Sequence, residues 1–331
     1  MTWFEELTGF REGSTEQIYE NLSIKGSAMR SQVNGKEFIW GSLEIPSLGE
    51  LREKALSCPK GKQGIHVREI LADTQELHTD ASNAGTLFQV ASQFNLLEMV
   101  SPNVTPEQGV TRYAQDFTQG PACAIAAGAG TIYRNYFVPI NDEVGQTIDR
   151  QIDCLADVGT FLGNSDNRLW RMQNGYALPS RDGLLAIAHR LQAASEAERD
   201  TLRQLLRIGI QWNTQVTLRN SSHLVSQAYC SALPVAYSAF SSNLWEHFAT
   251  LVLEASYEAT ICAALLNREQ TGNKTVYLTL IGGGAFGNRI EWIIAAIQRA
   301  LTIYAEYDLD VAIVSYSRSN PHIQQLITAL T

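Results

Sequence analysis

The sequence predicts an α/β protein whose mixed, largely parallel sheet is sandwiched by helices and preceded by a small N-terminal α+β extension. Short runs rich in β-branched residues alternate with longer amphipathic segments along most of the 331 residues. This alternation is typical of parallel strands that are joined by helices. Apolar residues make up 45% of the chain, which is the usual share for a protein with a packed core.

The charge balance excludes one large class of partners. The chain has 25 basic and 34 acidic residues, a net charge of −9. Broad nucleic-acid binding is not expected, because it depends on Lys and Arg that neutralise phosphates. An anion bound by such a chain would be held mainly by backbone amides.

The sequence shows no sign of a membrane or of a targeting segment. It lacks a run of about 18 apolar residues, so no membrane span is expected. The N-terminus lacks the basic start and apolar run of a signal peptide. We therefore expect a cytoplasmic protein that contacts no membrane.

The cysteine pattern indicates free thiols. The number of cysteines is odd, their spacing is wide and there is no Cys-x-x-Cys pair, so we expect a reducing compartment and no metal site. The five residues are Cys58, Cys123, Cys154, Cys230 and Cys262.

The N-terminal extension is predicted to span residues 1–64. A helix should begin after Ser14, which has the capping-box spacing with Gln17. Asn34-Gly35 is a strong hairpin signal. The flanking strands are expected over 29–33 and 37–40, and a second helix over 47–56.

The main domain is predicted to span residues 65–331, with an insertion near 140–215. Apolar and β-branched runs predict its strands, and amphipathic periodicity predicts its helices. The strands are expected over 65–72, 86–92, 223–230, 276–281 and 310–315, and the helices over 121–136, 243–266, 289–303 and 320–330. Within the insertion we expect helices over 147–162 and 184–208, and a hairpin over 168–178 about Asn174-Gly175.

A glycine-rich loop joins the strand over 276–281 to the helix over 289–303. Glycine lets the backbone approach a ligand closely, and a helix N-terminus presents unpaired N–H groups and a positive dipole end. Together they predict a diphosphate cradle. Neither a dinucleotide fingerprint nor a Gly-Lys-Ser/Thr loop is present, and a tight packing turn with Asn288 as helix N-cap is the alternative. The loop comprises Gly282, Gly283, Gly284, Ala285, Phe286, Gly287 and Asn288.

Four motifs, in order along the chain, resemble the macrodomain superfamily, an ADP-ribose-binding α/β fold. Gly284-Ala285-Phe286-Gly287 resembles the family's diphosphate loop. Asp73-Thr74 stands where the family's Asp receives the adenine amino group. Asn95 stands in the last place of the family's Asn-Ala-Ala-Asn motif and would face the distal ribose. Ser315-Tyr316 stands where the family often packs an aromatic ring on adenine.

The segment after Asn95 departs from most macrodomains. The first Asn of the Asn-Ala-Ala-Asn pattern is absent, and an acidic loop between Asn95 and Gly120 replaces the usual Gly-rich stretch. This loop and the helix start Gln119-Gly120-Pro121 resemble the divergent poly(ADP-ribose) glycohydrolase-like branch of the bacterial effector MavL, which removes ADP-ribose from arginine of modified ubiquitin. The resemblance implies ADP-ribose or an ADP-ribosylated protein as ligand and no cofactor. Gln119 would bind ribose hydroxyls or only fill the start of the helix.

The acidic loop offers carboxyl groups for glycosidic cleavage. The transition state is oxocarbenium-like, so one carboxylate can stabilise charge or activate water while a second carboxyl protonates the leaving group. Each acid also has an ordinary reading as a solvated or helix-capping carboxylate. The candidates are Glu98, Glu107 and Asp116.

The predicted function is an ADP-ribosyl hydrolase that removes ADP-ribose from modified protein, and the resemblance implies an arginine linkage and a ubiquitin-like target. We expect Asp73 and Tyr316 to hold adenine, Asn95 to orient ribose, and Glu107 with Asp116 to drive cleavage. The alternative is a non-catalytic reader, or sequestering module, for ADP-ribose or a related nucleotide signal. The fold serves both roles, but a reader has no use for two carboxylates beside the distal ribose.

Overall fold

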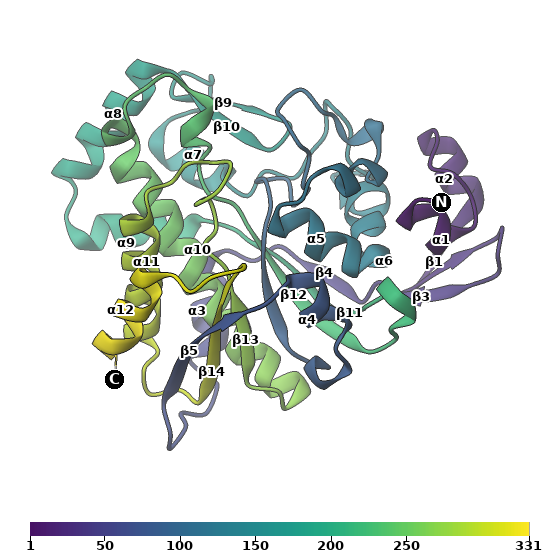
Figure 1. Ribbon diagram of the computed structural model, residues 1–331. Coiled ribbons are helices and arrows are strands. Elements are labelled where there is room, and N and C mark those ends of the chain that lie inside the picture. Colours follow the sequence, from purple (N-terminus) through teal and green to yellow (C-terminus); the bar gives the residue numbers. More distant parts are fainter. Residues whose placement is uncertain (331) are drawn as a thin grey trace.

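A seven-stranded sheet forms the centre of the protein in the computed structural model, which describes residues 1–330 (Figure 1). The strand order is β4-β11-β12-β6-β13-β14-β5. The five strands from β12 to β5 are mutually parallel, and β11 is antiparallel to both of its neighbours. The prediction of a mixed, largely parallel sheet is therefore confirmed. The strands are β4 Ser42–Glu44, β5 Ile65–Leu71, β6 Leu87–Ala91, β11 Gly209–Gln215, β12 Leu224–Cys230, β13 Thr275–Leu278 and β14 Leu309–Ser315.

Helices cover both faces of this sheet, as predicted. On β6, Gln89 donates to Thr260 of the central helix α10, whereas its neighbour Phe88 stacks on His78 of α4. Adjacent strand residues point to opposite faces, so these two helices lie on opposite sides of the sheet. The α10 layer contains α3 Leu48–Ala55, α8 Arg181–Ala193, α9 Glu196–Leu205, α10 Ser242–Thr271, α11 Ile290–Ile303 and α12 Pro321–Leu330. The other layer contains α4 Thr74–Thr79, α5 Gln119–Ala126 and α6 Gly128–Ile132.

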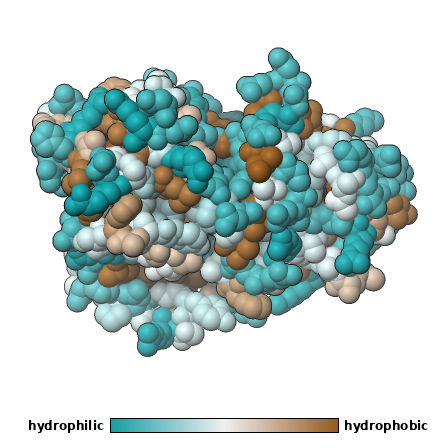
Figure 2. All heavy atoms as spheres, turned by 90° about the horizontal axis from the view of Figure 1, so that it is seen from above, coloured by the Kyte–Doolittle hydropathy of each residue, from teal (hydrophilic) through white to brown (hydrophobic). Residues whose placement is uncertain are grey.

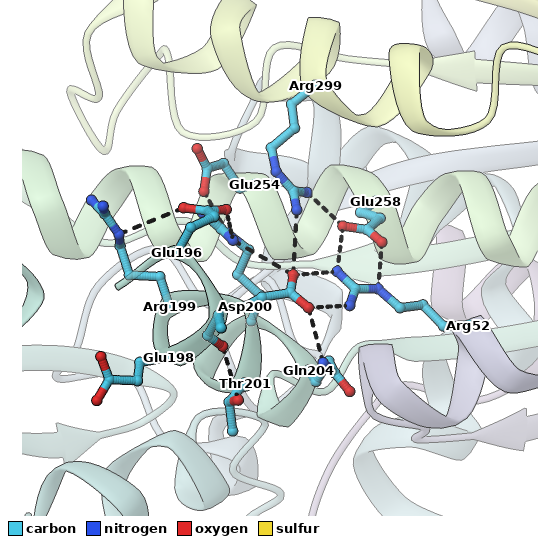
Figure 3. Close-up of polar contacts among 12 residues, drawn as sticks. Arg52, Glu196, Glu198, Arg199, Asp200, Thr201, Gln204, Glu254, Glu258 and Arg299 are labelled. Atoms are coloured by element: carbon cyan, nitrogen blue, oxygen red, sulfur yellow. Dashed lines mark hydrogen bonds and ion pairs between the residues drawn. The ribbon is translucent and has the colours of Figure 1, made fainter. Parts of the chain in front are cut away.

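Helix α10 is the core helix of the protein. By length and composition it could cross a membrane, but 83% of its most apolar 18-residue stretch is buried inside the protein. Its buried acid, Glu258, accepts from Arg52 of α3 and Arg299 of α11, each at 2.5 Å (Figure 3). Both guanidinium groups also reach Asp200 of α9. This ion network offsets the cost of burying the carboxylate and ties three helices to α10.

The N-terminal segment forms α1 Trp3–Thr8, α2 Thr15–Asn21 and a small antiparallel sheet. The predicted hairpin is present as β2 Ala28–Ser31 and β3 Glu37–Ile39, and an unpredicted strand, β1 Leu22–Lys25, pairs with β2. Ser14 caps α2 by accepting from the Gln17 amide, at 3.4 Å. Farther along, the predicted helix over 47–56 is α3, capped by Ser47. Strand β4 carries the same segment into the main sheet, and the domain boundary at residue 64 stays a prediction.

The predicted helix over 121–136 is wrong in its bounds. It begins earlier, at Gln119, and breaks at Ala127, whose φ is −114° and ψ is 59°. A π-helical turn, Tyr133–Phe137, ends it. Gly128, which lies just after the break, weakens helix formation. A Cβ on Gly128 would lie 2.8 Å from the Trp3 ring, so the absence of a side chain there lets α1 approach closely.

The segment 140–215 departs most from its prediction. The helix expected over 147–162 is present only as α7, Ala156–Leu162. The helix expected over 184–208 is two helices, because Ala194 turns extended after α8 and Ser195 caps the start of α9. The predicted hairpin is confirmed as β9 Trp170–Gln173 and β10 Tyr176–Pro179, whose turn residues Asn174 and Gly175 have φ of 47° and 77°. Strand β11, which was not predicted, places the end of this segment in the main sheet.

All five cysteines are free, as predicted, and all five are buried. Within residues 1–330, no group of three or more His, Cys, Asp or Glu side chains is arranged to hold a metal ion.

Candidate functional site

A cavity of about 1260 Å³ lies at the carboxyl ends of the parallel strands. Figure 2 shows the molecule from above, turned by 90° from the view of Figure 1. On the face seen there, apolar side chains lie between hydrophilic ones. Ligands of α/β sheets bind at this edge, where the loops after the strands meet. The strand ends contribute Asp73 and Thr74 after β5, Ser92 and Gln93 after β6, Cys230 and Ala232 at β12, Thr279 to Gly282 after β13, and Ser315 and Tyr316 after β14.

The cavity opens where two neighbouring strands separate. Strand β13 pairs with β6 only up to Phe88, so the last residues of β6 lack a strand partner on that side. The Gln119 side chain supplies these hydrogen bonds: its Oε1 accepts from the Ala91 amide at 2.9 Å, and its Nε2 donates to the Gln89 carbonyl at 2.8 Å. A Cβ on Gly120 would lie 2.0 Å from the Ala91 carbonyl oxygen. Gln119 thus lines the cavity, with its amide occupied by β6.

The glycine-rich loop is closed by its last residue. The Asn288 amide donates to the Gly282 carbonyl at 2.9 Å, and its side-chain Nδ2 donates to the Leu233 carbonyl at 2.8 Å. Gly282 and Gly287 have φ of 76° and 68°, conformations that favour glycine. The alternative of Asn288 as helix N-cap is wrong, because the N-cap of α11 is Arg289.

Three consecutive amides of this loop are free. Gly284, Ala285 and Phe286 line the cavity, and their backbone N–H groups donate to no acceptor within residues 1–330. Space beside the Gly284 Cα is open. Gly283 and Gly287 belong to the loop but do not line the cavity. The free amides can therefore bind an anion without a cationic side chain.

The loops after β5 and β14 form one end of the cavity. Asp73 is the N-cap of α4, where its Oδ1 accepts from the Gln75 amide at 2.7 Å. Thr74 and Ser315 line the wall, and Tyr316, 76% exposed, lies at the rim. The structure thus brings together the four residues that the sequence placed near adenine.

Glu69 of β5, which the sequence analysis did not select, holds the loop after β14. Its carboxylate accepts from the Ser315 and Ser319 hydroxyls at 2.5 and 2.6 Å and from the Asn320 amide at 2.7 Å. A fourth bond comes from Gln324 of α12, at 2.5 Å. Burial raises the pKa of Glu69, but these hydrogen bonds outweigh it and lower the pKa to about 2.

Replacing Glu69 by Gln is expected to lower the Tm at pH 7 by about 2 °C, the size expected for a loss near 1 kcal/mol. The folded-state pKa of about 2 lies below the unfolded value of about 4.3. The contribution of Glu69 is therefore complete above that value and disappears as the pH falls toward 2. Thermal unfolding of both proteins across pH 2–7 would test this, with the exposed Glu53→Gln as control. A Tm difference independent of pH would contradict it.

Glu98 lies in the cavity wall with its side chain 1% exposed. Neither carboxyl oxygen has a hydrogen-bond partner among the described residues, and Arg134 Nη2 is 3.8 Å from Oε1. Burial raises the pKa of Glu98 to about 8, although Arg134 and Tyr113 lower it. At pH 7 this group is therefore mostly a neutral acid that can donate a proton.

Asp116 lies in the wall beside Glu98. It ends the 3₁₀ turn η3, Thr111–Gln115, and its Oδ1 accepts from the Thr118 amide at 2.9 Å. Asp116 raises the pKa of Glu98, as a nearby carboxylate does. The N-cap of α5 is Thr118, so Asp116 does not cap that helix.

The structure does not bring Glu107 and Asn95 into the cavity wall. Glu107 accepts from the Ile148 amide at 2.7 Å. Asn95 is fully buried: its Nδ2 donates to Gln151 at 2.9 Å, and its Oδ1 accepts from the Leu97 amide at 3.1 Å. These bonds occupy both side chains in holding loops together.

Several residues of the cavity wall were not predicted from the sequence. The Thr279 hydroxyl is buried, lines the cavity and has no partner among the described residues. Tyr176 of β10 and Tyr237 form an aromatic triangle with Phe286, with ring centroids 5.3–5.6 Å apart. The Asn174-Gly175 turn signalled the hairpin that carries Tyr176, but no local pattern places that hairpin beside Phe286.

No protein-family model matches the chain, and no curated protein matches it. Among solved structures it is similar to a poly(ADP-ribose) glycohydrolase from Thermomonospora curvata, at 9% identity and a TM-score of 0.47, covering 96% of each chain. It is also similar to a poly(ADP-ribose) glycohydrolase from Deinococcus radiodurans in complex with ADP-ribose, at 10% identity and a TM-score of 0.46, covering 88% of this chain and 96% of that one. Similarity at this level does not place the chain in that family.

Proposed function

We propose that the protein is an ADP-ribosyl hydrolase that removes ADP-ribose from modified protein. The observation that carries the proposal is one cavity that combines free backbone amides with a buried, neutral carboxyl group. The amides of Gly284 to Phe286 suit a diphosphate, and Glu98 suits a leaving group that must be protonated. Arg318 is the one cationic side chain among the described lining residues, so backbone amides would dominate anion binding.

The positions of the wall residues suggest how ADP-ribose would bind. Asp73 and Tyr316 are at the end proposed for adenine, and the glycine-rich loop follows them toward Glu98. The distal ribose would then lie near Ser92 and Gln93 rather than Asn95. The cavity volume of about 1260 Å³ exceeds the 300–1,000 Å³ typical of small-molecule sites, which leaves room for the group attached to the ribose.

The two carboxyl groups in the wall fit the chemistry of cleavage. Glu98, in its neutral form, would donate its proton to the leaving atom as the glycosidic bond breaks. Asp116, in its charged form, would stabilise the oxocarbenium-like ribose or take a proton from the attacking water. Water then supplies the new hydroxyl on the ribose. These roles replace the sequence-based pairing of Glu107 with Asp116.

A macromolecular substrate fits the rim of the cavity. Phe117, next to Asp116, is 97% exposed; Val100 of the same acidic loop and Tyr316 of the loop after β14 are also exposed. Exposed apolar side chains gathered at one site often mark a contact with a larger partner. The resemblance to the MavL branch favours an arginine-linked, ubiquitin-like target, and buried free thiols favour the cytoplasm.

A reader of ADP-ribose is the second candidate, and Glu98 argues against it. Burying a carboxyl group with no hydrogen-bond partner costs stability. A protein that only binds ADP-ribose gains nothing from a buried carboxyl group next to a second acid. A general acid, by contrast, requires a raised pKa.

Asp116→Asn is expected to retain ADP-ribose binding but to lower release of ADP-ribose from arginine-modified protein by about 10²-fold, the effect typical of losing an acid–base group. Glu107→Gln, in the same loop but outside the wall, should release ADP-ribose at the wild-type rate. Calorimetry would measure binding, and single-turnover release would measure cleavage.

Three outcomes would change the proposal. Absence of ADP-ribose binding at millimolar ligand would reject both candidate functions. Tight binding without release by the wild-type protein would favour the reader. Loss of release in Glu107→Gln but not in Asp116→Asn would return the catalytic role to Glu107.

A further inference from the structure

One carboxylate of the N-terminal segment, that of Glu12, forms hydrogen bonds with the acidic loop. Glu12, between α1 and α2, accepts from the Val110 amide at 2.9 Å and from the Thr111 amide at 2.7 Å. It also accepts from the Tyr136 hydroxyl at 2.9 Å. A Cβ on Gly109 would lie 2.4 Å from the Glu12 carboxylate. The loop is therefore shaped to receive this side chain from a part of the chain about 100 residues away.

Both amides that Glu12 accepts from lie at the start of η3. The first amides of a helical turn lack internal acceptors, and η3 has no capping side chain of its own. Glu12 therefore takes the place of an N-cap, supplied from a distant segment. It fixes where η3 begins and in which direction it runs.

Turn η3 leads from Glu12 to both acids of the cavity wall. Asp116 follows the last residue of η3 directly. Tyr113, within η3, accepts from the Glu98 backbone amide at its hydroxyl, at 3.0 Å. A displacement of η3 would thus move Asp116 and release the backbone of Glu98.

Apolar packing joins the same elements. Phe4 and Leu7 of α1 share one buried cluster with Val110 and Tyr113, and Trp3 of α1 lines the cavity itself. The N-terminal segment thus contributes Trp3 to the cavity lining and supports the acidic loop.

We propose that Glu12 is a positioning residue for hydrolysis: it anchors η3 so that Asp116 and Glu98 face the distal ribose together. This inference rests on the proposed function, and it gives the N-terminal segment a part in the reaction. Glu12 does not line the cavity, so it acts through η3 and touches no substrate. A misplacement of about 1 Å in a catalytic group can cost about 10²-fold in rate.

The test compares Glu12→Gln with Glu20→Gln, an exposed acid on α2 of the same segment. Glu12→Gln should lower kcat by about 10- to 100-fold while the ADP-ribose Kd stays within about threefold, since the diphosphate loop and Asp73 are untouched. Tyr113→Phe, which removes the acceptor of the Glu98 amide at the other end of the connection, should also lower kcat. Glu20→Gln should match the wild type.

A second readout does not need turnover. The titration of Glu98, followed by ¹³C NMR of glutamate-labelled protein and assigned with Glu98→Gln, reports the surroundings of that carboxyl directly. It should shift in Glu12→Gln and remain unchanged in Glu20→Gln. A shift with wild-type-like Tm would exclude general unfolding as its cause.

The outcomes separate the two proposals. Unchanged kcat and an unchanged Glu98 titration in Glu12→Gln would overturn the positioning role. A parallel loss of ADP-ribose affinity, kcat and Tm would also overturn it, because it would show a general structural role. If the wild type releases no ADP-ribose, the proposed function fails, and the Glu98 titration alone decides whether Glu12 positions that group.

Discussion

Glu98→Gln is expected to lower release of ADP-ribose from modified protein by about 10²- to 10⁴-fold, the range for a lost general acid. The amide has the same shape and is uncharged, as the Glu98 carboxyl mostly is at pH 7, so ADP-ribose binding should persist. Single-turnover release and calorimetry on the same preparations would measure the two effects. Release at the wild-type rate would remove Glu98 from the mechanism.

The pH dependence of the wild type gives an independent check of Glu98. Release should fall as the pH rises through about 8, because the proton to be donated is lost. Release by Glu98→Gln should not show this fall. Burial raises the pKa of Glu98 most; Arg134 and Tyr113 lower it, and Asp116 raises it further. The charge of Glu98 in turn raises the pKa values of Tyr229 and Cys123.

The stability of the protein should also depend on the protonation of Glu98. The folded-state pKa of Glu98, about 8, lies above the unfolded value of about 4.3. The stability that this group contributes is therefore complete below about 4.3 and is lost as the pH rises to about 8. Glu98→Gln should therefore raise Tm relative to wild type more at pH 9 than at pH 5. A Tm difference between the two proteins that is the same at pH 5 and pH 9 would show that Arg134 keeps the carboxyl charged.

Gly282→Ala is expected to lower ADP-ribose affinity by about 10- to 100-fold, as a strain of about 1–3 kcal/mol in the binding loop would do. Gly282 has a φ of 76°, and a Cβ there would lie 2.4 Å from the Ala232 Cβ. To relieve this contact, the loop must move together with the free amides of Gly284 to Phe286. Calorimetry with ADP-ribose measures the loss.

Gly272→Ala is the matched control for backbone strain. Gly272 ends α10 with a φ of 75° and open space around its Cα, so alanine there brings similar strain away from the cavity. Gly272→Ala should lower Tm and leave affinity unchanged. Equal affinities for the two variants would indicate that the glycine-rich loop does not hold the diphosphate.

Local signals were sufficient for most of the parallel sheet. Strands β6, β12, β13 and β14 are mostly apolar runs bounded by turn residues, and such runs predict buried strands. Strand β5 lies at the edge of the sheet and mixes polar residues with β-branched ones, which are typical of strands. Strand β11 was not predicted because it follows a helix closely and pairs with β4, which precedes it by more than 160 residues. Pairing over that distance leaves no periodic trace in either segment.

The site was predictable only where a motif is local. The glycine-rich loop and Asp73 could be placed because each follows its strand directly. Glu107 and Asn95 lie in a loop whose path depends on bonds to Ile148 and Gln151. The burial that makes Glu98 an acid depends on tertiary neighbours such as Arg134, which spacing in the sequence does not reveal.

The separation of β6 from β13 has a consequence for the linkage between binding and folding. Near the cavity the two halves of the sheet, β4-β11-β12-β6 and β13-β14-β5, share no backbone hydrogen bonds within residues 1–330. A ligand held by Gln93 on one half and by the glycine-rich loop on the other would bridge them like an additional strand. Its binding energy would then oppose unfolding of the sheet as a whole, by RT ln(1 + [L]/Kd), and slow amide exchange in strands that it never touches.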